Sequence, residues 1–548
     1  MSLKRALLST VLLATPVFAQ SGPIDPQRMS DVTKTLASDE FQGRAPGTPG
    51  EDKTVAYLAD QFAKAGLAPA GDNGTYVQTV PLVRTRIGAN PIVTATTKGG
   101  AVALTQLKDV YFSTVRDTPR VAITNAPIVF IGYGTRAPER KWDDFKGVDL
   151  HGKVVIFLVN DPDFTAVAGE PVAGTFGGKR MTYYGRWTYK YEEAARQGAI
   201  AALIVHETSG AGYGWNTVIA PQGENYDIIR AKDDYRVLMQ GWLEGEAAKN
   251  LFAKSGLDLD KLSIAARRAD FKPVPLDATL TVDAAVTADH VQSKNLIGKI
   301  AGTTHADETI MFGAHWDAYG VGTPDATGRT IRAGAADDAI GVAGVLEIAR
   351  AFAKGPKPQR TLLFAAWTGE ERGLLGSEHY AAHPLYPLDK TVANLTLDVL
   401  QTAGPARDVV LVGDGQSDLE DRLAAAAKTQ NRTITPEALP ERGLFFRADH
   451  FSFARRGVPS LLLMGMSGGH DLVTGGRAAG DAWLTDYMKC YHQPCDVWKP
   501  SWDLRGAAQD VALFYDIGRD LANSRAWPDW RPGTEFKDLR AKSVSSRN

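Results

Sequence analysis

Apolar runs and helical periods alternate along the C-terminal half of the chain. Five short apolar runs have the length of buried strands: residues 293–300, 309–313, 360–367, 392–399 and 458–464. Between the second and the third run, apolar side chains recur at helical spacing over residues 339–353: Val342, Val345, Leu346, Ala349 and Phe352. Because strands alternate with helices, we expect an α/β domain whose mostly parallel, mixed sheet is sandwiched between helices.

Two other regions precede this domain. A helix is predicted to open at Thr48, because apolar side chains recur at helical spacing after it: Val55, Leu58, Phe62 and Leu67. From residue 118 to residue 273 the pattern predicts a second set of strands and helices. The strands are expected at 126–132, 152–159 and 200–205, and a helix at 191–197. This series predicts a separate core, and therefore an inserted β/α domain at 118–273, between residues 20–117 and residues 274–548.

The first residues have the pattern of a secretory signal peptide. Lys4 and Arg5 precede an apolar stretch at 6–19, and Val17 and Ala19 place small side chains at the two key positions before the cleavage site. The stretch is shorter than the roughly 20 residues of a membrane-spanning helix, and no later stretch is long and apolar enough to span. We therefore expect cleavage after Ala19 and an exported chain, periplasmic or secreted, with no membrane span in its mature form.

Length and charge narrow the class of protein. A chain of 548 residues is too long for one ordinary core, which agrees with two or more domains. Lys and Arg number 61 and Asp and Glu number 63, so the net charge is −2. This balance gives no electrostatic reason to expect nucleic acid or an anionic membrane as a partner. The number of subunits stays open.

Imidazole and carboxylate groups fall where the predicted strands end. His315 follows the strand at 309–313, and Asp337 precedes the helix at 339–353. Glu370 and Glu371 follow the strand at 360–367, and Asp398 lies at the end of the strand at 392–399. Ligands bind at the carboxyl ends of strands in open α/β sheets, so these groups are expected to meet at one edge. Crowded carboxylates repel one another unless cations neutralise them, and a mixture of imidazole and carboxylate suits Zn²⁺.

Short motifs around these residues resemble those of the co-catalytic zinc exopeptidases, which include bacterial leucyl aminopeptidases and glutamate carboxypeptidase. The motifs are at 313–317, 334–341, 368–377, 397–399, 448–450 and 491–496. One departure from the family pattern is Val399, which stands where Met is usual. The resemblance covers about 27–120 and 275–525, and the region 118–273 resembles the protease-associated domain that this family often carries as an insertion.

The resemblance implies a peptidase with two Zn²⁺ ions per chain. Its motifs assign Asp337 as the bridging ligand, His315 and Asp398 as ligands of one ion, and Glu371 and His492 as ligands of the other. They also imply that Asp317 orients His315 and that Glu370 is the general base rather than a ligand. The implied substrate is a peptide cut at a chain end, with an aminopeptidase favoured. The alternatives are a carboxypeptidase of the glutamate carboxypeptidase type and a non-catalytic binding protein on the same fold.

Three residues near the motifs have two interpretations each. Asp338 is interpreted as a helix N-cap in preference to a metal ligand. Asp449 and His450 either line the substrate site or hold a loop by hydrogen bonds, and the sequence favours neither.

Three other features bear on substrate and mechanism. Cys490 and Cys495 flank His492, and a disulfide that stiffens this loop is favoured over free thiols. Ser467 lies in a G-x-S-x-G pattern, but a glycine-rich loop follows it where a serine hydrolase needs a helix, so that class is disfavoured. A carboxypeptidase needs a cation for the substrate carboxylate, and three arginines lie near the Asp449 motif: Arg442, Arg447 and Arg455.

Overall fold

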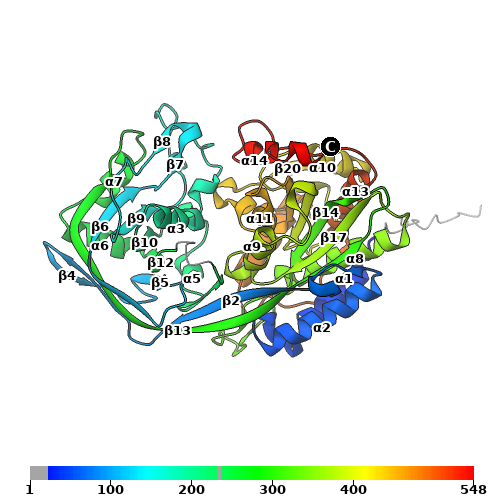
Figure 1. The fold of residues 1–548 in the computed structure, drawn as a ribbon, viewed down its shortest axis with the longest axis horizontal. Coiled ribbons are helices and arrows are strands. Elements are labelled where there is room, and N and C mark those ends of the chain that lie inside the picture. The colour runs from blue at the N-terminus through cyan, green and yellow to red at the C-terminus, as the bar shows by residue number, and fades with distance from the viewer. Residues whose placement is uncertain (1–22, 231–235, 548) are drawn as a thin grey trace, which may run out of the picture.

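The computed structural model describes residues 23–230 and 236–547, and the predicted signal peptide at 1–19 lies outside the described residues. Two lobes lie side by side in Figure 1, and the long strand β13 (Val274–Ile300) runs along both. We call residues 23–76 and 296–547 the first lobe and residues 88–285 the second lobe. Within the described ranges, no helix has the length and apolar character needed to cross a membrane.

The first lobe is built on five strands in the order β21–β18–β14–β17–β13. Neighbouring strands are parallel from β21 to β17, and β13 runs antiparallel to β17. Their bounds are β14 (His305–His315), β17 (Arg360–Trp367), β18 (Thr391–Asp398) and β21 (Ser460–Met464). Each of the five predicted runs overlaps one of these strands, and the predicted mostly parallel, mixed sheet is confirmed.

Successive side chains of each strand point to opposite faces of the sheet, so both faces are apolar, and helices cover both of them. On one face Phe312 stacks on Phe364 with ring centroids 5.3 Å apart, in a core shared with α1, α8 and α13. On the other face Trp367 packs against Tyr380 of α9 and Phe453 of α11. The helices of this lobe are α1 (Pro26–Leu36), α2 (Pro49–Lys64), α8 (Ile340–Lys354), α9 (Leu375–Ala382), α10 (Leu419–Thr429), α11 (His450–Ala454), α12 (Gly476–Cys490), α13 (Arg505–Ala522) and α14 (Lys537–Ala541).

The second lobe has its own mixed sheet, in the order β13–β6–β9–β10–β12–β5. The strands β6, β9, β10 and β12 are parallel neighbours, while β5 and β13 are antiparallel to theirs. One face packs against α6 and α7 and the other against α3, α4 and α5, so the lobe has two apolar cores of its own. The bounds are β3 (Ile92–Thr97), β4 (Gly100–Ala103), β5 (Val110–Ser113), β6 (Arg120–Gly132), β9 (Val154–Leu158), β10 (Ala201–Val205), β12 (Met239–Leu243), α3 (Trp187–Arg196), α4 (Thr208–Ala211), α5 (Trp215–Val218), α6 (Gly245–Lys254) and α7 (Leu259–Ala265).

The second lobe is wider than the predicted insertion at 118–273. Its core also contains Val93 and Phe112, which precede that range, and Leu280 and Val282, which follow it. The predicted boundary at residue 273 coincides with the start of β13, which continues through both lobes as one strand of 27 residues.

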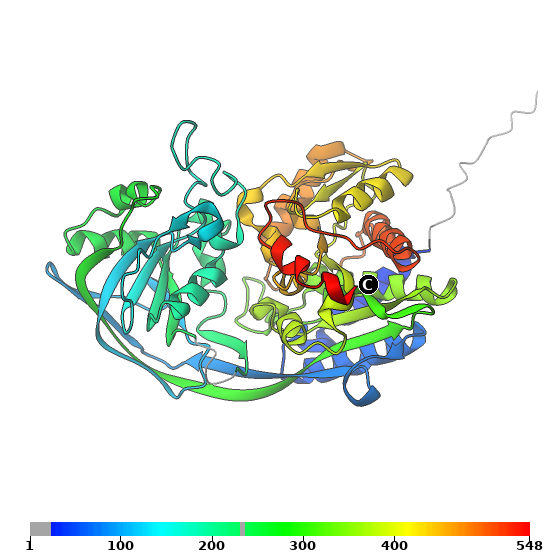
Figure 2. The same cartoon turned by 45° about the horizontal axis from the view of Figure 1, so that its top comes forward.

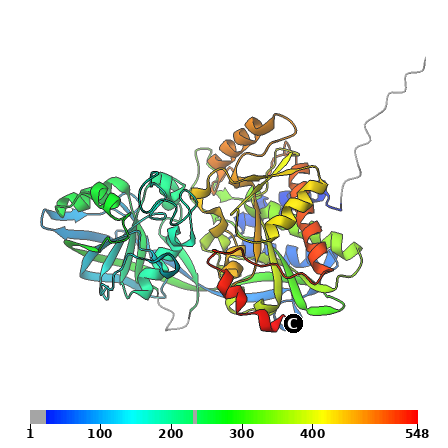
Figure 3. The same cartoon turned by 90° about the horizontal axis from the view of Figure 1, so that it is seen from above.

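The lobes are joined by a ribbon of long strands. β2 (Val77–Ile87) pairs antiparallel with β13 from Val286 to Leu296, and β11 (Glu224–Ile228) pairs with β2. Figure 2 shows β13 arching beneath both lobes, and Figure 3 shows the lobes side by side from above. The C-terminal segment packs on the first lobe, where Trp530 is 1% exposed and donates a hydrogen bond from Nε1 to the Gly457 carbonyl.

Candidate metal centre

The sheet of the first lobe brings the predicted residues to one edge. His315 is the last residue of β14, and Asp398 is the last residue of β18. Glu370 and Glu371 lie in a short 3-10 turn just after β17, whose Trp367 is in register with His315. Because these three strands are parallel, their carboxyl ends meet at the same edge, as the sequence predicted.

Three ligand-type side chains meet at the ends of β14 and β18. His315 Nε2 lies 3.0 Å from Asp337 Oδ1 and 3.8 Å from Asp398 Oδ1. The three side chains present one ligand atom each within 4.8 Å of one another, and all are buried. We call His315, Asp337 and Asp398 the buried group.

Three ligand-type side chains also meet on the solvent side of Asp337. His492 Nε2 lies 3.3 Å from Asp337 Oδ2 and 3.0 Å from Glu371 Oε2. These three side chains also place one ligand atom each within 4.8 Å of one another. We call Asp337, Glu371 and His492 the cleft group. Asp337 belongs to both groups and turns one carboxylate oxygen towards each histidine.

The charges of the two groups are strongly coupled. Burial by itself would lower the pKa of both histidines, but neighbouring carboxylates reverse this. Glu370 raises the pKa of His315 well above its usual value, and Glu371 and Asp337 raise the pKa of His492 to about 9. Excess negative charge at the site thus holds a proton on each imidazole. A divalent cation would replace these protons, because metal binding requires neutral imidazole and ionised carboxylate.

Glu370 stands next to both groups but belongs to neither. Its Oε2 lies 3.9 Å from His315 Nε2, and its side chain lines the cleft described below. Burial raises the pKa of Glu370 well above its usual range, and Asp398 and Asp449 add to this effect while His315 opposes it. A carboxyl group with a raised pKa beside open space is suited to accept a proton near neutral pH.

Asp317 contacts both His315 and Glu370. Its backbone carbonyl lies 3.1 Å from His315 Nδ1, whereas its carboxylate Oδ1 lies 3.6 Å from the same nitrogen. Asp317 Oδ1 also accepts a hydrogen bond of 3.1 Å from the backbone N–H of Glu370. The residue contacts the His315 ring on the side away from Asp337, where it can fix the ring's orientation.

Two buried carboxylates hold the backbone around Asp337. Asp338 accepts hydrogen bonds from the N–H groups of Gly341 at 3.0 Å and Val399 at 3.1 Å, so it has the capping contact that the sequence favoured. Asp338 belongs to neither of the two groups. Asp496 accepts from the N–H groups of Ala336 at 3.0 Å and Asp337 at 3.1 Å. The loop that carries Asp337 is therefore fixed from both sides.

One residue that supports the site, Arg44, is not predicted from the sequence. Its guanidinium is fully buried and donates to the carbonyls of Trp316 and Gly334, which flank His315 and the Asp337 loop in the chain. It also donates to the carbonyls of Leu36 and Ala333. No motif distinguishes this arginine in the sequence, because its partners are backbone atoms that come together only in the folded chain.

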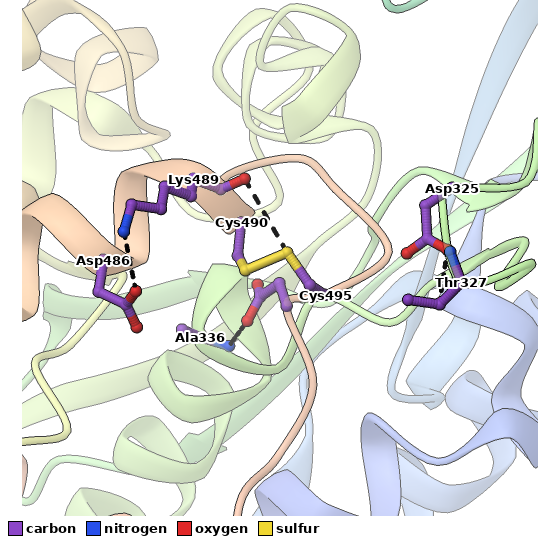
Figure 4. Close-up of a disulfide and its surroundings, with 8 residues drawn as sticks. Asp325, Thr327, Ala336, Asp486, Lys489, Cys490 and Cys495 are labelled. Carbon is purple, nitrogen blue, oxygen red and sulfur yellow. Dashed lines mark hydrogen bonds and ion pairs between the residues drawn. A yellow bond between two sulfur atoms is a disulfide. The ribbon is translucent and has the colours of Figure 1, made fainter.

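The loop that carries His492 is closed by a disulfide between Cys490 and Cys495, whose Cα atoms are 5.1 Å apart (Figure 4). His492 itself has a left-handed backbone conformation, with φ of 61°. Its ring lies 3.7 Å from the Tyr491 ring and 4.6 Å from the Tyr319 ring, measured between centroids. The disulfide that the sequence favoured is present, and it encloses the ligand-type residue.

Asp449 and His450, for which the sequence left two roles open, are both buried. Asp449 and His450 are 1% and 0% exposed, and neither lines the cleft. His450 packs edge-on against Phe445, with ring centroids 4.8 Å apart. Ser467 is also buried, and its hydroxyl donates to the Met464 carbonyl at 2.7 Å, which gives a serine nucleophile no support.

A cleft of about 1420 Å³, including open solvent at its mouth, lies over the cleft group and Glu370. Its floor includes Glu370, Glu371 and His492 of the first lobe. Its walls include residues of the second lobe, among them Tyr111 and Trp242. Of the three arginines predicted near the Asp449 motif, Arg447 and Arg455 line the cleft, whereas Arg442 packs against Gly212.

Comparison with known proteins agrees with this geometry. The sequence is 38% identical over 91 residues to a probable zinc metalloprotease of Pyrenophora tritici-repentis, and 37% identical over 120 residues to a probable glutamate carboxypeptidase of Arthroderma benhamiae. These segments are 17% and 21% of this chain, and they span only 20% and 15% of the two relatives. The fold is similar to that of the aminopeptidase from Aneurinibacillus sp. strain AM-1, with a TM-score of 0.52 and 21% identity over 94% of this chain and 97% of that one.

The sequence profile of one peptidase family matches residues 295–515, which include both groups and Glu370. The matching profile is that of peptidase family M28, and it confirms the predicted resemblance to zinc exopeptidases over this part of the chain.

Proposed function

We propose that the chain is an exported aminopeptidase that holds two zinc ions, one in the buried group and one in the cleft group. The observation that carries this proposal is the position of Asp337, whose two carboxylate oxygens face different histidines at 3.0 and 3.3 Å. A carboxylate between two imidazoles is the arrangement that a bridging ligand needs. Each group offers one histidine and two carboxylates, a donor set that suits zinc and leaves room for a non-protein ligand.

Glu370 is the proposed general base. Zinc, when bound, lowers the pKa of water and polarises carbonyl oxygens. The Glu370 side chain lines the cleft, and its carboxylate can take a proton from the attacking water and then deliver it to the departing amine. Asp317 positions this residue by accepting a hydrogen bond from its backbone N–H. General acid–base catalysis of this kind contributes about 10²–10⁴-fold to the rate.

The floor of the cleft favours a free amino end of a peptide. Glu370 and Glu371 both face the cleft, and the cation beside them on its lining, Arg372, is paired with Glu224 at 3.6 Å. Carboxylates attract an ammonium group and repel a terminal carboxylate. A carboxypeptidase is the second candidate, and one observation favours it: Arg186 and Arg447 on the cleft wall are able to bind a substrate carboxylate.

Export and the identity of the second lobe belong to the same proposal. A signal peptide at 1–19 would deliver the chain to an oxidising compartment, and a disulfide at Cys490–Cys495 agrees with that environment. The second lobe is proposed to be a protease-associated domain, and its side chains on the cleft wall would help to select the substrate.

Peptides that differ only in a free or blocked amino end distinguish an aminopeptidase from a carboxypeptidase. Purified protein is assayed on peptides with free and blocked amino ends, before and after removal of metal by a chelator. An aminopeptidase cleaves only the free peptides, and a chelated sample loses activity that zinc restores. Cleavage of blocked and free peptides at equal rates contradicts an aminopeptidase, and activity that survives complete chelation contradicts the zinc site.

The role of Glu370 is tested by the variant Glu370→Gln. We expect kcat to fall by about 10²–10⁴-fold, because the amide cannot accept a proton. Zinc content, measured by elemental analysis, should stay at two ions per chain. The exposed Glu40, whose side chain is 70% accessible, provides the matched control Glu40→Gln. Loss of zinc in Glu370→Gln would show that Glu370 is a ligand.

A further inference from the structure

A second cavity lies where the two lobes meet, beside the cleft over the metal centre. Its volume is about 730 Å³, including open solvent at its mouth. Three segments line it: the end of β2, the loop that leads into β11, and the hairpin of β15 (Gly320–Val321) and β16 (Ile331–Arg332). Tyr319 and Arg372 line both the cavity and the cleft, whereas neither Glu370 nor any residue of the two ligand groups lines the cavity.

The lining of this cavity is positively charged. Arg86, Arg332 and Arg372 line it, and Glu224 is the one carboxylate among the described residues that do so. Glu224 Oε2 lies 2.6 Å from Arg86 Nε, and Glu224 Oε1 lies 3.6 Å from Arg372 Nη2. One carboxylate therefore serves two guanidinium groups, and three positive charges against one negative charge leave a net charge of +2.

Arg332 is the cation that the protein leaves unpaired. Among the residues that the structure describes, no carboxylate lies within ion-pair distance of its guanidinium, which extends over Gly322, where a Cβ would collide with it. Burial lowers the pKa of Arg332, and the positive charge of Arg372 adds to this effect while Asp325 opposes it. Two neighbouring guanidinium groups that are partly removed from water are unfavourable unless an anion joins them.

Neutral hydrogen-bonding groups stand beside these cations. The Thr323 hydroxyl accepts from Arg332 Nη2 and from Gln222 Nε2, both at 3.4 Å, so its own hydrogen is available to an anion. Gln222 and Thr323 both line the cavity, and they come from different lobes. Arginine binds tetrahedral oxyanions through paired hydrogen bonds, and an ion with two negative charges would balance the lining.

We propose that this cavity binds a free dianion of the phosphate or sulfate class, held by Arg86, Arg332 and Arg372. The bound ion joins the two lobes, because the loop with Gln222 belongs to the second lobe and Arg332 belongs to the first. Binding requires neither zinc nor a peptide. The inference therefore goes beyond the proposed function and does not depend on it.

The position of the cavity connects the ion to the metal centre. The Arg372 guanidinium covers the Tyr319 ring at 4.7 Å, and the Tyr319 ring lies 4.6 Å from the ring of His492. Tyr319 also donates a hydrogen bond from its hydroxyl to the Glu371 carbonyl at 3.3 Å. An ion on Arg372 thus fixes the wall that supports the cleft group.

Sulfate is the probe for the test. Zinc-loaded full-length protein is titrated with sodium sulfate in a calorimeter at constant ionic strength, and sodium chloride is titrated in the same way. We expect one saturable site for sulfate and an affinity for chloride that is lower by about tenfold or more, because chloride carries one charge and no oxygen atoms.

Two variants should change the affinity in opposite directions. Arg332→Gln should weaken sulfate binding by about tenfold or more, and Arg332→Lys should restore part of it. Glu224→Gln should tighten binding by about tenfold, because it removes the carboxylate that competes for Arg86 and Arg372. The matched control is Arg268→Gln, since the Arg268 side chain is 70% exposed and remote in the second lobe.

The zinc content of every variant is measured as well, because Arg332 also borders a small cavity beside the cleft group. Opposite shifts in Arg332→Gln and Glu224→Gln at unchanged zinc content support the ion site, even if the wild type cleaves no peptide. An affinity that is the same in both variants and the wild type overturns it, even if the wild type is an active peptidase.

Two further outcomes are decisive. The absence of saturable sulfate binding up to about 10 mM overturns the site. Thermal unfolding shows whether Arg332→Gln folds, and Glu224→Gln decides alone if it does not. Tighter binding in Glu224→Gln then supports the site, and unchanged or weaker binding overturns it.

Discussion

The buried group and the cleft group share Asp337 but differ in how the protein supports them. In the buried group, His315 and Asp398 end two neighbouring parallel strands, and the His315 side chain is 1% exposed. In the cleft group, Glu371 and His492 come from turns, and the His492 side chain is 12% exposed. One half of the centre is thus fixed by the sheet, and the other depends on loops that face the substrate.

This difference suggests a division of labour between the two halves. Ligands on strand ends are held by the hydrogen bonds of the sheet and by packing on both of its faces, so they keep their geometry without a metal. Ligands on loops are easier to displace, and loops that line a cleft are in contact with substrate. We expect the buried group to bind zinc more persistently and the cleft group to exchange it more readily.

The largest effect is expected from Asp337→Ala, because this residue belongs to both groups. Loss of its carboxylate would remove a ligand from each of the two proposed ions, and it leaves the two histidines without their common partner. We expect loss of both zinc ions and a fall in peptidase activity of at least about 10³-fold. Elemental analysis and a peptide assay measure the two effects.

Asp486→Ala is the matched control for this change, since the Asp486 side chain is 70% exposed and lies on α12 in the same lobe. An Asp337→Ala protein that keeps two ions would contradict the bridging role. Retention of one ion would show that the two groups are independent sites.

The second effect distinguishes the two groups by their rate of metal release. When zinc-loaded protein is mixed with a coloured chelator, we expect two phases whose rates differ by about tenfold or more. His492→Ala should abolish the fast phase, because it removes a ligand of the cleft group. His315→Ala should abolish the slow phase. If His492→Ala removes the slow phase instead, the comparison between strand-end and loop ligands fails.

The sequence predicted the buried group more directly than the cleft group, for a physical reason. Regular strands have a recognisable apolar pattern, and the rule that parallel strands share one ligand-binding edge places His315 and Asp398 together without further knowledge. No comparable rule places His492, which lies far along the chain in an irregular loop. Its assignment came only from the resemblance of its motif to a known family.

Other features could not be predicted because they depend on the folded chain as a whole. Arg44 supports the site through backbone carbonyls, and Arg186 reaches the cleft only because the second lobe packs against the first. The full length of β13 is a different case. Every second residue is buried from Leu276 through Leu280 to Val286, an alternation visible in the sequence that predicts a strand, although the strand predicted above begins only at residue 293.

A smaller effect is expected from opening the disulfide that closes the loop of His492. In the double variant Cys490→Ser, Cys495→Ser the loop gains freedom, so zinc in the cleft group should bind about tenfold more weakly. The free energy of unfolding should fall by about 2 kcal/mol at most, since the loop closed by the disulfide is short. Competition with a chelator measures the affinity, and denaturant unfolding measures the stability. Unchanged zinc affinity would show that packing of His492 between Tyr319 and Tyr491 is sufficient to hold it.

The smallest effect at neutral pH concerns His450, a buried histidine that belongs to neither group. Burial lowers the pKa of His450 from 6.5 to about 3, and its ring is 0% exposed, so the folded chain keeps it neutral where the unfolded chain protonates it. Its contribution to stability is therefore fully present above pH 6.5 and is lost as the pH falls towards 3. The loss amounts to roughly 1.4 kcal/mol per pH unit within that window.

The variant His450→Phe isolates this contribution, because phenylalanine has a similar shape and does not titrate. We expect the difference in unfolding free energy between wild type and variant to depend on pH below 6.5 and to be constant above it. Denaturant unfolding of zinc-free protein at several pH values measures this difference without metal release. A constant difference across the whole range would mean that His450 is protonated in the folded chain. A partner for that proton would then lie beside His450, whose surroundings would be electrostatic as well as apolar.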